Sequence, residues 1–260
     1  MKMIILFLCF INQIVFSQTL KPELINKLII ETDNFIGFDA LGDFYYTKEN
    51  VFLKKTKLQL LEYKNLSLGK IYKIDIQNPL KIVLFYQDFN TIITLDNQLN
   101  ETQKINFSDF ENPINVSATG ISSNNKLWVF NSFDNKIGLF NYLKKDYKSI
   151  SVPISYSIKN YNSDFNNFYF IDENNKFYYC DIYGRILFLM KIPDFDQVSI
   201  INSGQIIYSK NNNLFLFDLK NNQNQKIEIS EKTIENFCYK NQILTIFTIQ
   251  EISNYKINLE

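Results

Sequence analysis

The feature that most constrains this chain is a short pattern that recurs about every 40 residues. Each copy has an Asn-containing turn, an alternating run of apolar residues and a polar stop, usually Asp or Asn. The copies end at residues 55, 96, 141, 181, 218 and 256, so successive ends lie 37 to 45 residues apart. The clearest copies are Asp134–Asn141, Asn174–Asp181 and Asn211–Asp218, and the weaker ones are Glu49–Lys55, Phe89–Asp96 and Glu251–Lys256. A pattern that returns at this spacing indicates a repeat architecture.

Short runs of β-branched and aromatic residues accompany every copy, and such runs are typical of strands. The runs that precede the copies are Asp43–Thr47, Lys81–Tyr86, Lys126–Asn131, Asn167–Asp172, Gln205–Ser209 and Gln242–Thr248. Further candidates lie before these runs, at Phe35–Phe38, Ile71–Ile76, Asn115–Ile121, Val198–Ile201 and Ile234–Tyr239. Others follow the copies, at Leu58–Tyr63, Gln103–Phe107, Tyr147–Ser151, Ile186–Ile192 and Lys226–Ile229. The sequence therefore predicts a unit of four strands.

Four antiparallel strands that recur about every 40 residues form the blade of a β-propeller, which buries its faces against neighbouring blades in a closed ring. The expected fold class is therefore all-β, a six-bladed β-propeller. A β-sandwich or barrel is the alternative, but it offers no reason for the pattern to return in register. No break in composition divides the chain, so we expect residues 18–260 to form a single domain.

The sixth repeat ends after its third strand, which would leave a sheet edge unpaired. The segment Leu20–Ile30 is the remaining material, so we expect it to supply the missing outer strand. Two features oppose this prediction: Pro22 lacks a backbone donor, and a short helix over Glu23–Ile29 is a competing structure. On balance, the ring is predicted to be closed by its N-terminal segment.

The N-terminus has the features of a signal peptide. Lys2 gives it a positive start, Met3–Phe16 is almost wholly apolar, and Val15 and Ser17 occupy the two positions that signal peptidase recognises. We expect cleavage before Gln18, which removes residues 1–17 and places the protein in the periplasm, peripheral to the outer membrane. A membrane anchor is the alternative, but about 14 apolar residues are fewer than the roughly 20 that a spanning helix needs. Direct membrane insertion is therefore not expected.

Composition excludes several classes of function. The sequence contains no histidine, which removes histidine acid–base catalysis, imidazole metal ligands and Ser-His or Cys-His nucleophiles. Its 27 basic side chains balance 27 acidic ones, so no positive field attracts nucleic acid, and no nucleic-acid partner is expected. After signal-peptide cleavage, Cys180 and Cys238 remain, and the predicted order puts them on the fourth and sixth blades. We therefore expect two reduced thiols.

No motif for a metal or cofactor stands out, and neither is expected. Asp172–Lys176 resembles part of a calcium loop, but Lys176 stands where an oxygen ligand is needed. Asp194 and Asp196 form a carboxylate pair of the kind that glycosidases use. Asp residues that follow Pro193 are, however, typical of a turn. We therefore expect no catalytic residue and no enzymatic activity.

One group of loops indicates binding. In a four-stranded blade, the loop between the second and third strands opens on the same face of the ring as the loop to the next blade. Four phenylalanines with neighbouring carboxylates fall in such loops: Phe89 with Asp88, Phe110 with Asp109, Phe133 with Asp134, and Phe195 with Asp194. Exposed rings beside acidic side chains are suited to a protein-binding face. The alternative is that the rings fill gaps between blades.

Several stretches carry a resemblance to a known family: Gly37–Tyr46, Tyr72–Tyr86, Leu127–Asn131 and Lys191–Asp196. Over nearly the whole chain after the signal peptide, the sequence resembles exported β-propeller-like proteins of flavobacteria. It also resembles the plug subunit of the type nine secretion translocon. That resemblance implies a rigid, non-enzymatic disc that seals the periplasmic mouth of an outer-membrane secretion pore, with the translocon as its partner. It supplies no site residue.

Two classes of function stay open. The first is a protein-interaction module that engages an outer-membrane protein. The second is a glycan-binding or glycan-cleaving propeller that uses carboxylates and tyrosines. A carboxylate pair facing the central funnel at a separation of about 5–10 Å would favour the second class. A face with exposed phenylalanines would favour the first.

Overall fold

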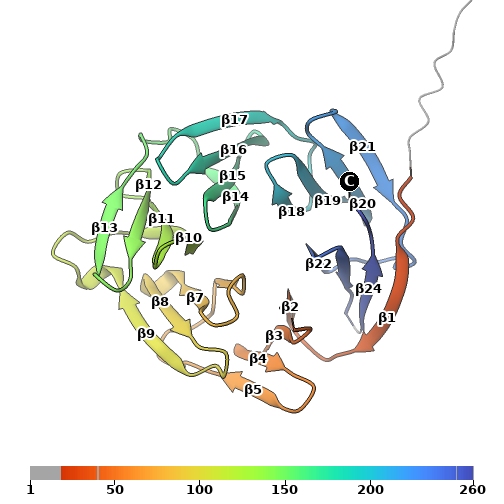
Figure 1. Ribbon diagram of the computed structural model, residues 1–260, viewed down its shortest axis with the longest axis horizontal. Helices are drawn as coiled ribbons and strands as arrows, with labels where there is room; N and C mark the ends of the chain where they lie inside the picture. The colour runs from red at the N-terminus through yellow and green to blue at the C-terminus, as the bar shows by residue number, and fades with distance from the viewer. Residues whose placement is uncertain (1–18, 40, 250, 260) are drawn as a thin grey trace, which may run out of the picture.

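The computed structural model describes residues 19–39, 41–249 and 251–259, whose strands form six four-stranded antiparallel sheets in a ring (Figure 1). Each sheet is one blade, and its strands succeed one another from the centre of the ring to its rim. The predicted six-bladed β-propeller is confirmed. The predicted signal peptide, residues 1–17, and its cleavage site before Gln18 lie outside the described residues.

The first three blades follow one another along the chain. Blade 1 contains β2 (Asn34–Phe38), β3 (Phe44–Lys48), β4 (Val51–Lys55) and β5 (Leu60–Tyr63). Blade 2 contains β6 (Lys73–Asp75), β7 (Ile82–Tyr86), β8 (Thr91–Leu95) and β9 (Glu101–Asn106), with short 3-10 turns η1 (Gln87–Phe89) and η2 (Phe107–Asp109) after β7 and β9. Blade 3 contains β10 (Val116–Ser122), β11 (Lys126–Asn131), β12 (Lys136–Asn141) and β13 (Asp146–Ser149).

The other three blades complete the ring. Blade 4 contains β14 (Ile158–Ser163), β15 (Asn167–Asp172), β16 (Lys176–Asp181) and β17 (Ile186–Lys191). Blade 5 contains β18 (Gln197–Asn202), β19 (Gln205–Lys210), β20 (Asn213–Asp218) and β21 (Gln223–Ile227). Blade 6 contains β22 (Asn236–Lys240), β23 (Ile243–Phe247), β24 (Glu251–Lys256) and, at the rim, β1 (Glu23–Ile29).

The strand β1 closes the ring, as predicted. It pairs antiparallel with β24, from Glu23 opposite Lys256 to Ile29 opposite Glu251, so the competing helix does not form. Leu20 adds a bridge to the rim of blade 5, where its backbone N–H donates to the carbonyl oxygen of Lys226 at 2.8 Å. Pro22 precedes the strand, so its missing donor does not interrupt the pairing.

The inner strand of blade 4 was not among the strands predicted from the sequence. β14 has the sequence IKNYNS, in which polar residues replace the apolar run expected of a strand. Asn160 and Asn162 line the central channel, where a buried apolar side chain is not required. The pattern of apolar residues did not predict β14, because this strand forms by pairing with β15 at the centre of the ring and does not need a continuous apolar run.

Apolar cores lie between neighbouring blades, as the propeller architecture requires. Phe85 and Ile92 of blade 2, for example, pack with Leu127 and Phe140 of blade 3. Cys180 lies on β16 and Cys238 on β22, and both thiols are free. The predicted placement of the two cysteines on the fourth and sixth blades is confirmed, and their reduced state in the native protein stays a prediction.

The turns explain why the sequence pattern repeats. Asn124 and Asn125 between β10 and β11, and Asn211 and Asn212 between β19 and β20, all have positive φ angles between 49° and 58°. Two successive left-handed residues make the tight hairpin turn that matches strand twist, and Asn tolerates this conformation. The polar stops cap turns as well, since Oδ1 of Asp181 accepts hydrogen bonds from the backbone N–H groups of Tyr183 and Arg185 at 2.9 and 3.1 Å.

Candidate functional site

The four predicted phenylalanine loops open on one face of the ring. Phe89 and Phe133 follow the second strands of blades 2 and 3, whereas Phe110 and Phe195 lie in the connections to blades 3 and 5. Because the strands alternate in direction, these loops emerge at the same end of the propeller. We call this end the connecting face, since it carries the loops that join successive blades.

Two of the four rings are structural, which corrects the prediction of four exposed phenylalanines. Phe195 is only 8% exposed and packs in the core between blades 4 and 5. The ring of Phe110 is half-buried and packs edge-on against Phe140, with centroids 5.5 Å apart. These two rings fill the gaps between adjacent blades, and that packing is the alternative that the sequence left open.

The other two rings are free for contact. Phe89 is 49% exposed and Phe133 is 69% exposed. Leu66, Tyr72 and Val152 are also exposed on loops of the connecting face. None of these three residues was predicted from the sequence, because their loops contain other apolar residues and have no pattern that separates exposed from buried side chains. Together with Phe89 and Phe133, they form what we call the apolar set.

Hydrogen bonds hold the loops of the apolar set together. The Asn50 side chain donates to the carbonyl oxygen of Gly69 at 2.6 Å, and the Gly69 backbone lies against the Phe89 ring. The side chain of Asn90, next to Phe89, donates to the carbonyl oxygen of Ile114 at 2.6 Å.

The same interactions continue along blades 3 and 4. The Asn115 side chain donates to the Ser132 hydroxyl at 2.7 Å, one residue before Phe133. The backbone N–H of Ile154 then donates to the carbonyl oxygen of Asn135 at 2.8 Å. The loops that carry the apolar set are therefore one connected, ordered surface over blades 1 to 4.

The predicted acidic neighbours have different surroundings. Asp88 is exposed beside Phe89, and Asp109 is exposed but accepts a hydrogen bond from the side chain of Asn106 at 2.9 Å. Asp134 accepts a hydrogen bond from the backbone N–H of Lys136 at 3.2 Å, which stabilises its own turn. Asp88 and Asp134 therefore flank the two exposed rings, as predicted, whereas Asp109 accompanies the packed Phe110.

Asp194 and Asp196 form an ion-pair cluster. Lys210 Nζ lies 2.6 Å from Asp194 and 3.2 Å from Asp196. The hydrogen bond from Lys210 is the main cause that lowers the pKa of Asp194. The backbone N–H of Asn211 is the main cause that lowers the pKa of Asp196. A glycosidase acid needs a raised pKa, so these two carboxylates are not arranged for glycoside cleavage.

A hollow of about 450 Å³ adjoins the apolar set on blades 2 to 4. Its lining includes the tyrosines Tyr72, Tyr156 and Tyr161, together with polar residues such as Gln87 and Glu173. Tyr156 stacks on Tyr178 with ring centroids 4.9 Å apart, which holds it in place. The hollow gives the connecting face a concave part next to exposed rings.

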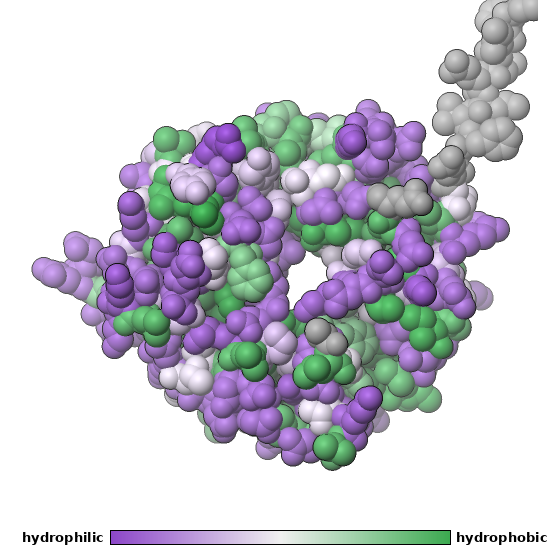
Figure 2. Space-filling model, viewed as in Figure 1, coloured by the Kyte–Doolittle hydropathy of each residue, from purple (hydrophilic) through white to green (hydrophobic). Residues whose placement is uncertain are grey.

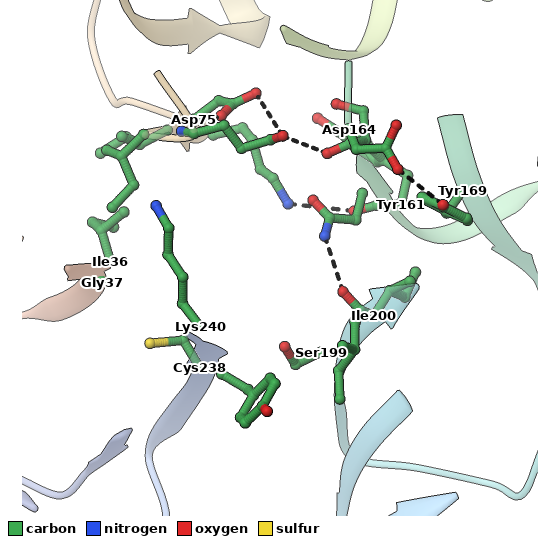
Figure 3. Close-up of a pocket in the computed structure, with 18 of the residues that line it drawn as sticks. Ile36, Gly37, Asp75, Tyr161, Asp164, Tyr169, Ser199, Ile200, Cys238 and Lys240 are labelled. Carbon is green, nitrogen blue, oxygen red and sulfur yellow. Dashed lines mark hydrogen bonds between the residues drawn. The ribbon is translucent and has the colours of Figure 1, made fainter. Parts of the chain in front are cut away.

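The second hollow is the central channel, which Figure 2 shows as an opening through the middle of the disc. It has a volume of about 490 Å³ and is lined by residues of all six inner strands. Figure 3 shows Asp75, Ser199 and Lys240 around this cavity, contributed by β6, β18 and β22. The channel therefore gathers polar side chains from distant parts of the sequence.

Hydrogen bonds across the channel link blade 2 to blades 3 and 4. Asp75 Oδ2 accepts a hydrogen bond from the backbone N–H of Ile121 at 2.8 Å, and the Gln77 side chain donates to the carbonyl oxygen of Ser163. Gly120 permits this approach, because a Cβ atom there would lie 2.1 Å from Ser163 Oγ. Burial raises the pKa of Asp75, although the N–H donors of Ile121 and Gln77 oppose that shift.

The two carboxylates that line the channel are both engaged in structure. Asp75 also accepts from the backbone N–H of Gln77 at 2.9 Å. Asp164 accepts from the backbone N–H groups of Asn166 and Asn167 at 2.7 Å, and from the Tyr169 hydroxyl at 2.9 Å. A free carboxylate pair, which would favour glycan cleavage, is therefore not formed by these two residues.

Within the described residues, no group of three or more His, Cys, Asp or Glu side chains is arranged to hold a metal ion. The described part of the chain also contains no helix with the length and apolar character needed to cross a membrane.

Solved structures resemble this chain at the level of the fold. Virginiamycin B lyase from Staphylococcus aureus superimposes with a TM-score of 0.59 and 15% identity, over 93% of this chain and 96% of the lyase. A histidine-to-alanine variant of that lyase, described as catalytically inactive and solved with quinupristin, has a TM-score of 0.55 and 18% identity, over 85% of this chain and 79% of the variant. The β-propeller domain of Cps50 (Swd1) from Myceliophteria thermophila has a TM-score of 0.59 and 7% identity, over 91% of this chain and all of that domain (100%).

Sequence comparison adds little beyond the fold. No protein-family model matches the chain. It is 26% identical over 144 residues to a BTB/POZ domain-containing protein of Acanthamoeba polyphaga mimivirus, which is 53% of this chain but only 28% of the viral protein. At these levels of identity, the likenesses establish the β-propeller fold and leave the activity to be inferred from the site.

Proposed function

We propose that this chain is a non-enzymatic, exported β-propeller that binds a protein partner through its connecting face. The observation that carries the proposal is the apolar set, in which Phe89 and Phe133 are exposed on loops held in one ordered surface. Exposed aromatic and aliphatic side chains on a rigid surface are typical of binding sites, because they lose water on contact without first having to be ordered.

The proposal that the protein is not an enzyme rests on missing chemistry. The lyase with the same fold has an inactive variant in which one histidine is replaced, and this sequence contains no histidine to take such a role. The carboxylates of the channel and of the Asp194 cluster are occupied by backbone donors or by Lys210. These observations support binding rather than catalysis.

For the partner, we propose an outer-membrane protein, specifically a secretion translocon whose periplasmic mouth the disc seals. The resemblance to translocon plug subunits, together with the expected signal peptide, supports this assignment. A rigid ring with ordered loops on one face is suited to covering a large opening. Loss of the protein should then make the outer membrane permeable to large antibiotics. An unchanged permeability barrier would contradict the sealing role without affecting the proposal of a binding face.

The binding face is tested by capture of a tagged native copy from outer membranes, followed by identification of the co-purified proteins. Phe89→Ala combined with Phe133→Ala should greatly weaken recovery of the partner. The matched control is Tyr183→Ala, which removes an exposed aromatic ring from the β16–β17 turn on the opposite face. Equal recovery by the double variant and the control would contradict the proposal.

A second candidate, glycan binding, is favoured by one observation. The hollow on the connecting face is lined by Tyr72 and Tyr156, next to the polar side chains of Gln87 and Glu173. Aromatic faces with neighbouring hydrogen-bonding groups are suited to stacking against sugar rings. Titration with soluble oligosaccharides should then show saturable binding that Tyr72→Ala abolishes, and absence of any such binding would leave protein binding as the function of this face.

A further inference from the structure

The central channel contains one cationic group, Lys240, whose charge acts on Asp75 at a distance but which is outside the hydrogen bonds and ion pairs of the described residues. The side chain of Lys240 extends from β22 into the cavity, toward the end at which Asp75 lies (Figure 3). Among the described residues, none forms a hydrogen bond or ion pair with its ammonium group. An ammonium held inside a cavity without a partner has lost part of its hydration, so an anion that enters the cavity gains a strong interaction.

The other charged groups of the channel already have partners. Lys73 Nζ donates to the carbonyl oxygen of Tyr161 at 3.4 Å and lies 4.8 Å from the centre of the Tyr161 ring. Asp75 and Asp164 each accept hydrogen bonds from backbone N–H groups, so their carboxyl oxygens are engaged within the fold. Lys240 is therefore the charged group of the channel that is available to a ligand.

Uncharged polar groups lie around the same cavity. The Ser199 hydroxyl points into it, and Asn160 also lines it (Figure 3 shows Ser199). Neither side chain forms a hydrogen bond with the described residues. A hydroxyl and an amide in the lining of the same cavity are further groups to which a polar ligand can form hydrogen bonds.

The rest of the wall is apolar. Ile36, Ile74, Val198 and Phe237 contribute to the lining. Gly37 leaves space in this wall, since a Cβ atom there would lie 3.2 Å from Ile76 Cδ1 and narrow the cavity. A volume of about 490 Å³ with apolar walls and a few convergent polar groups is typical of a small-molecule site.

We infer that the central channel binds a small organic monocarboxylate. The carboxylate group contacts Lys240 Nζ, and the short apolar body of the ligand packs against Ile36 and Val198 in the lining of the cavity. A single negative charge matches the single ammonium of Lys240, whereas a phosphate dianion carries one charge more than that ammonium balances. This site is distinct from the protein-binding face, and either inference can fail without the other.

Benzoate is the probe for this site, measured by isothermal titration calorimetry with the full chain after the predicted cleavage site. We expect saturable binding at a stoichiometry of one, and benzamide, which has the same shape without the charge, should bind at least about 10-fold more weakly. Lys240→Met should weaken benzoate binding by about 10-fold or more. The matched control, Lys191→Met, removes an exposed ammonium on the rim strand β17 and should bind benzoate like the parent protein.

Three results would overturn the inference: no saturable benzoate binding up to about 10 mM, equal binding of benzoate and benzamide, or full binding by Lys240→Met. Circular dichroism and thermal melting accompany each variant. Since Lys240 has no partner in the described fold, Lys240→Met should melt like the parent. If it unfolds instead, Lys240 has a structural role, and Lys240→Gln then decides whether binding requires the charge.

Discussion

Replacing Phe195 and Phe133 separately by alanine tests how the connecting face is built. Both rings belong to loops on that face, and the sequence gives them the same kind of surroundings, with an acidic neighbour on each. In the structure, Phe195 is 8% exposed whereas Phe133 is 69% exposed. The two substitutions should therefore have very different effects on the free energy of unfolding.

The magnitude follows from what each ring contacts. Phe195 packs with residues of both blades 4 and 5, including Ile171 and Ile200, so truncation leaves a cavity between the blades. Removal of a buried phenylalanine typically costs about 3–5 kcal/mol. Lys159 Nζ also lies 4.1 Å from the centre of the Phe195 ring, and loss of that contact adds about 0.5–1 kcal/mol at a partly exposed site. Truncation of the exposed Phe133 should change stability by no more than about 0.5 kcal/mol.

Thermal melting followed by circular dichroism is the appropriate assay. For a chain of this size, about 1 kcal/mol corresponds to a shift of roughly 2–4 °C. Phe195→Ala should therefore lower the melting temperature by roughly 7–24 °C, and Phe133→Ala by less than about 2 °C. Equal shifts for the two variants would refute the division of the four rings into two that pack and two that are free.

Three further predictions concern closure, the thiols and export. Removal of Leu20–Ile30 leaves the edge of β24 unpaired. The free energy of unfolding should then fall by a large part of its typical value of about 5–15 kcal/mol. An unchanged denaturation midpoint would show that the segment is dispensable. Burial raises the pKa of the Cys180 thiol to about 12 and that of the Cys238 thiol to about 11. Both thiols are therefore protonated at about pH 8 and should not react with an aromatic disulfide reagent until the protein is denatured. Recovery of a Cys180–Cys238 linked peptide under non-reducing conditions would contradict this. The intact mass of the native protein should correspond to a chain that begins at Gln18, and retention of residues 1–17 would exclude the predicted signal peptide.

The strands and turns of the propeller were largely predictable because their determinants are local. Segments such as Lys126–Asn131 and Asn213–Asp218 combine alternating apolar residues with polar ends, and each forms a strand within those limits. The exception is β14, whose asparagines face the channel instead of a core. Its pairing with β15 depends on the completed ring, so no local apolar pattern was available to predict it.

The candidate site was predictable only in part. The sequence placed Phe89 and Phe133 in loops of one face, but it could not separate them from Phe110 and Phe195. Leu66, Tyr72 and Val152 were not selected, because an apolar residue in a loop has no periodic pattern to distinguish exposure from burial. These residues share one surface with Phe89 and Phe133 because hydrogen bonds from the side chains of Asn90 and Asn115 join the loops in the folded chain.

The repeat, the antiparallel blade and the need to close the ring are encoded in local segments, since backbone turn geometry and alternating burial act over a few residues at a time. Which phenylalanine rings are exposed depends instead on how neighbouring blades pack in the folded chain. The packing of the blades also determines which polar groups meet in the channel, where Asp75, Ser199 and Lys240 come from three blades that are far apart along the chain. Only closure of the ring brings these side chains together, so their proximity leaves no trace in any local segment of the sequence.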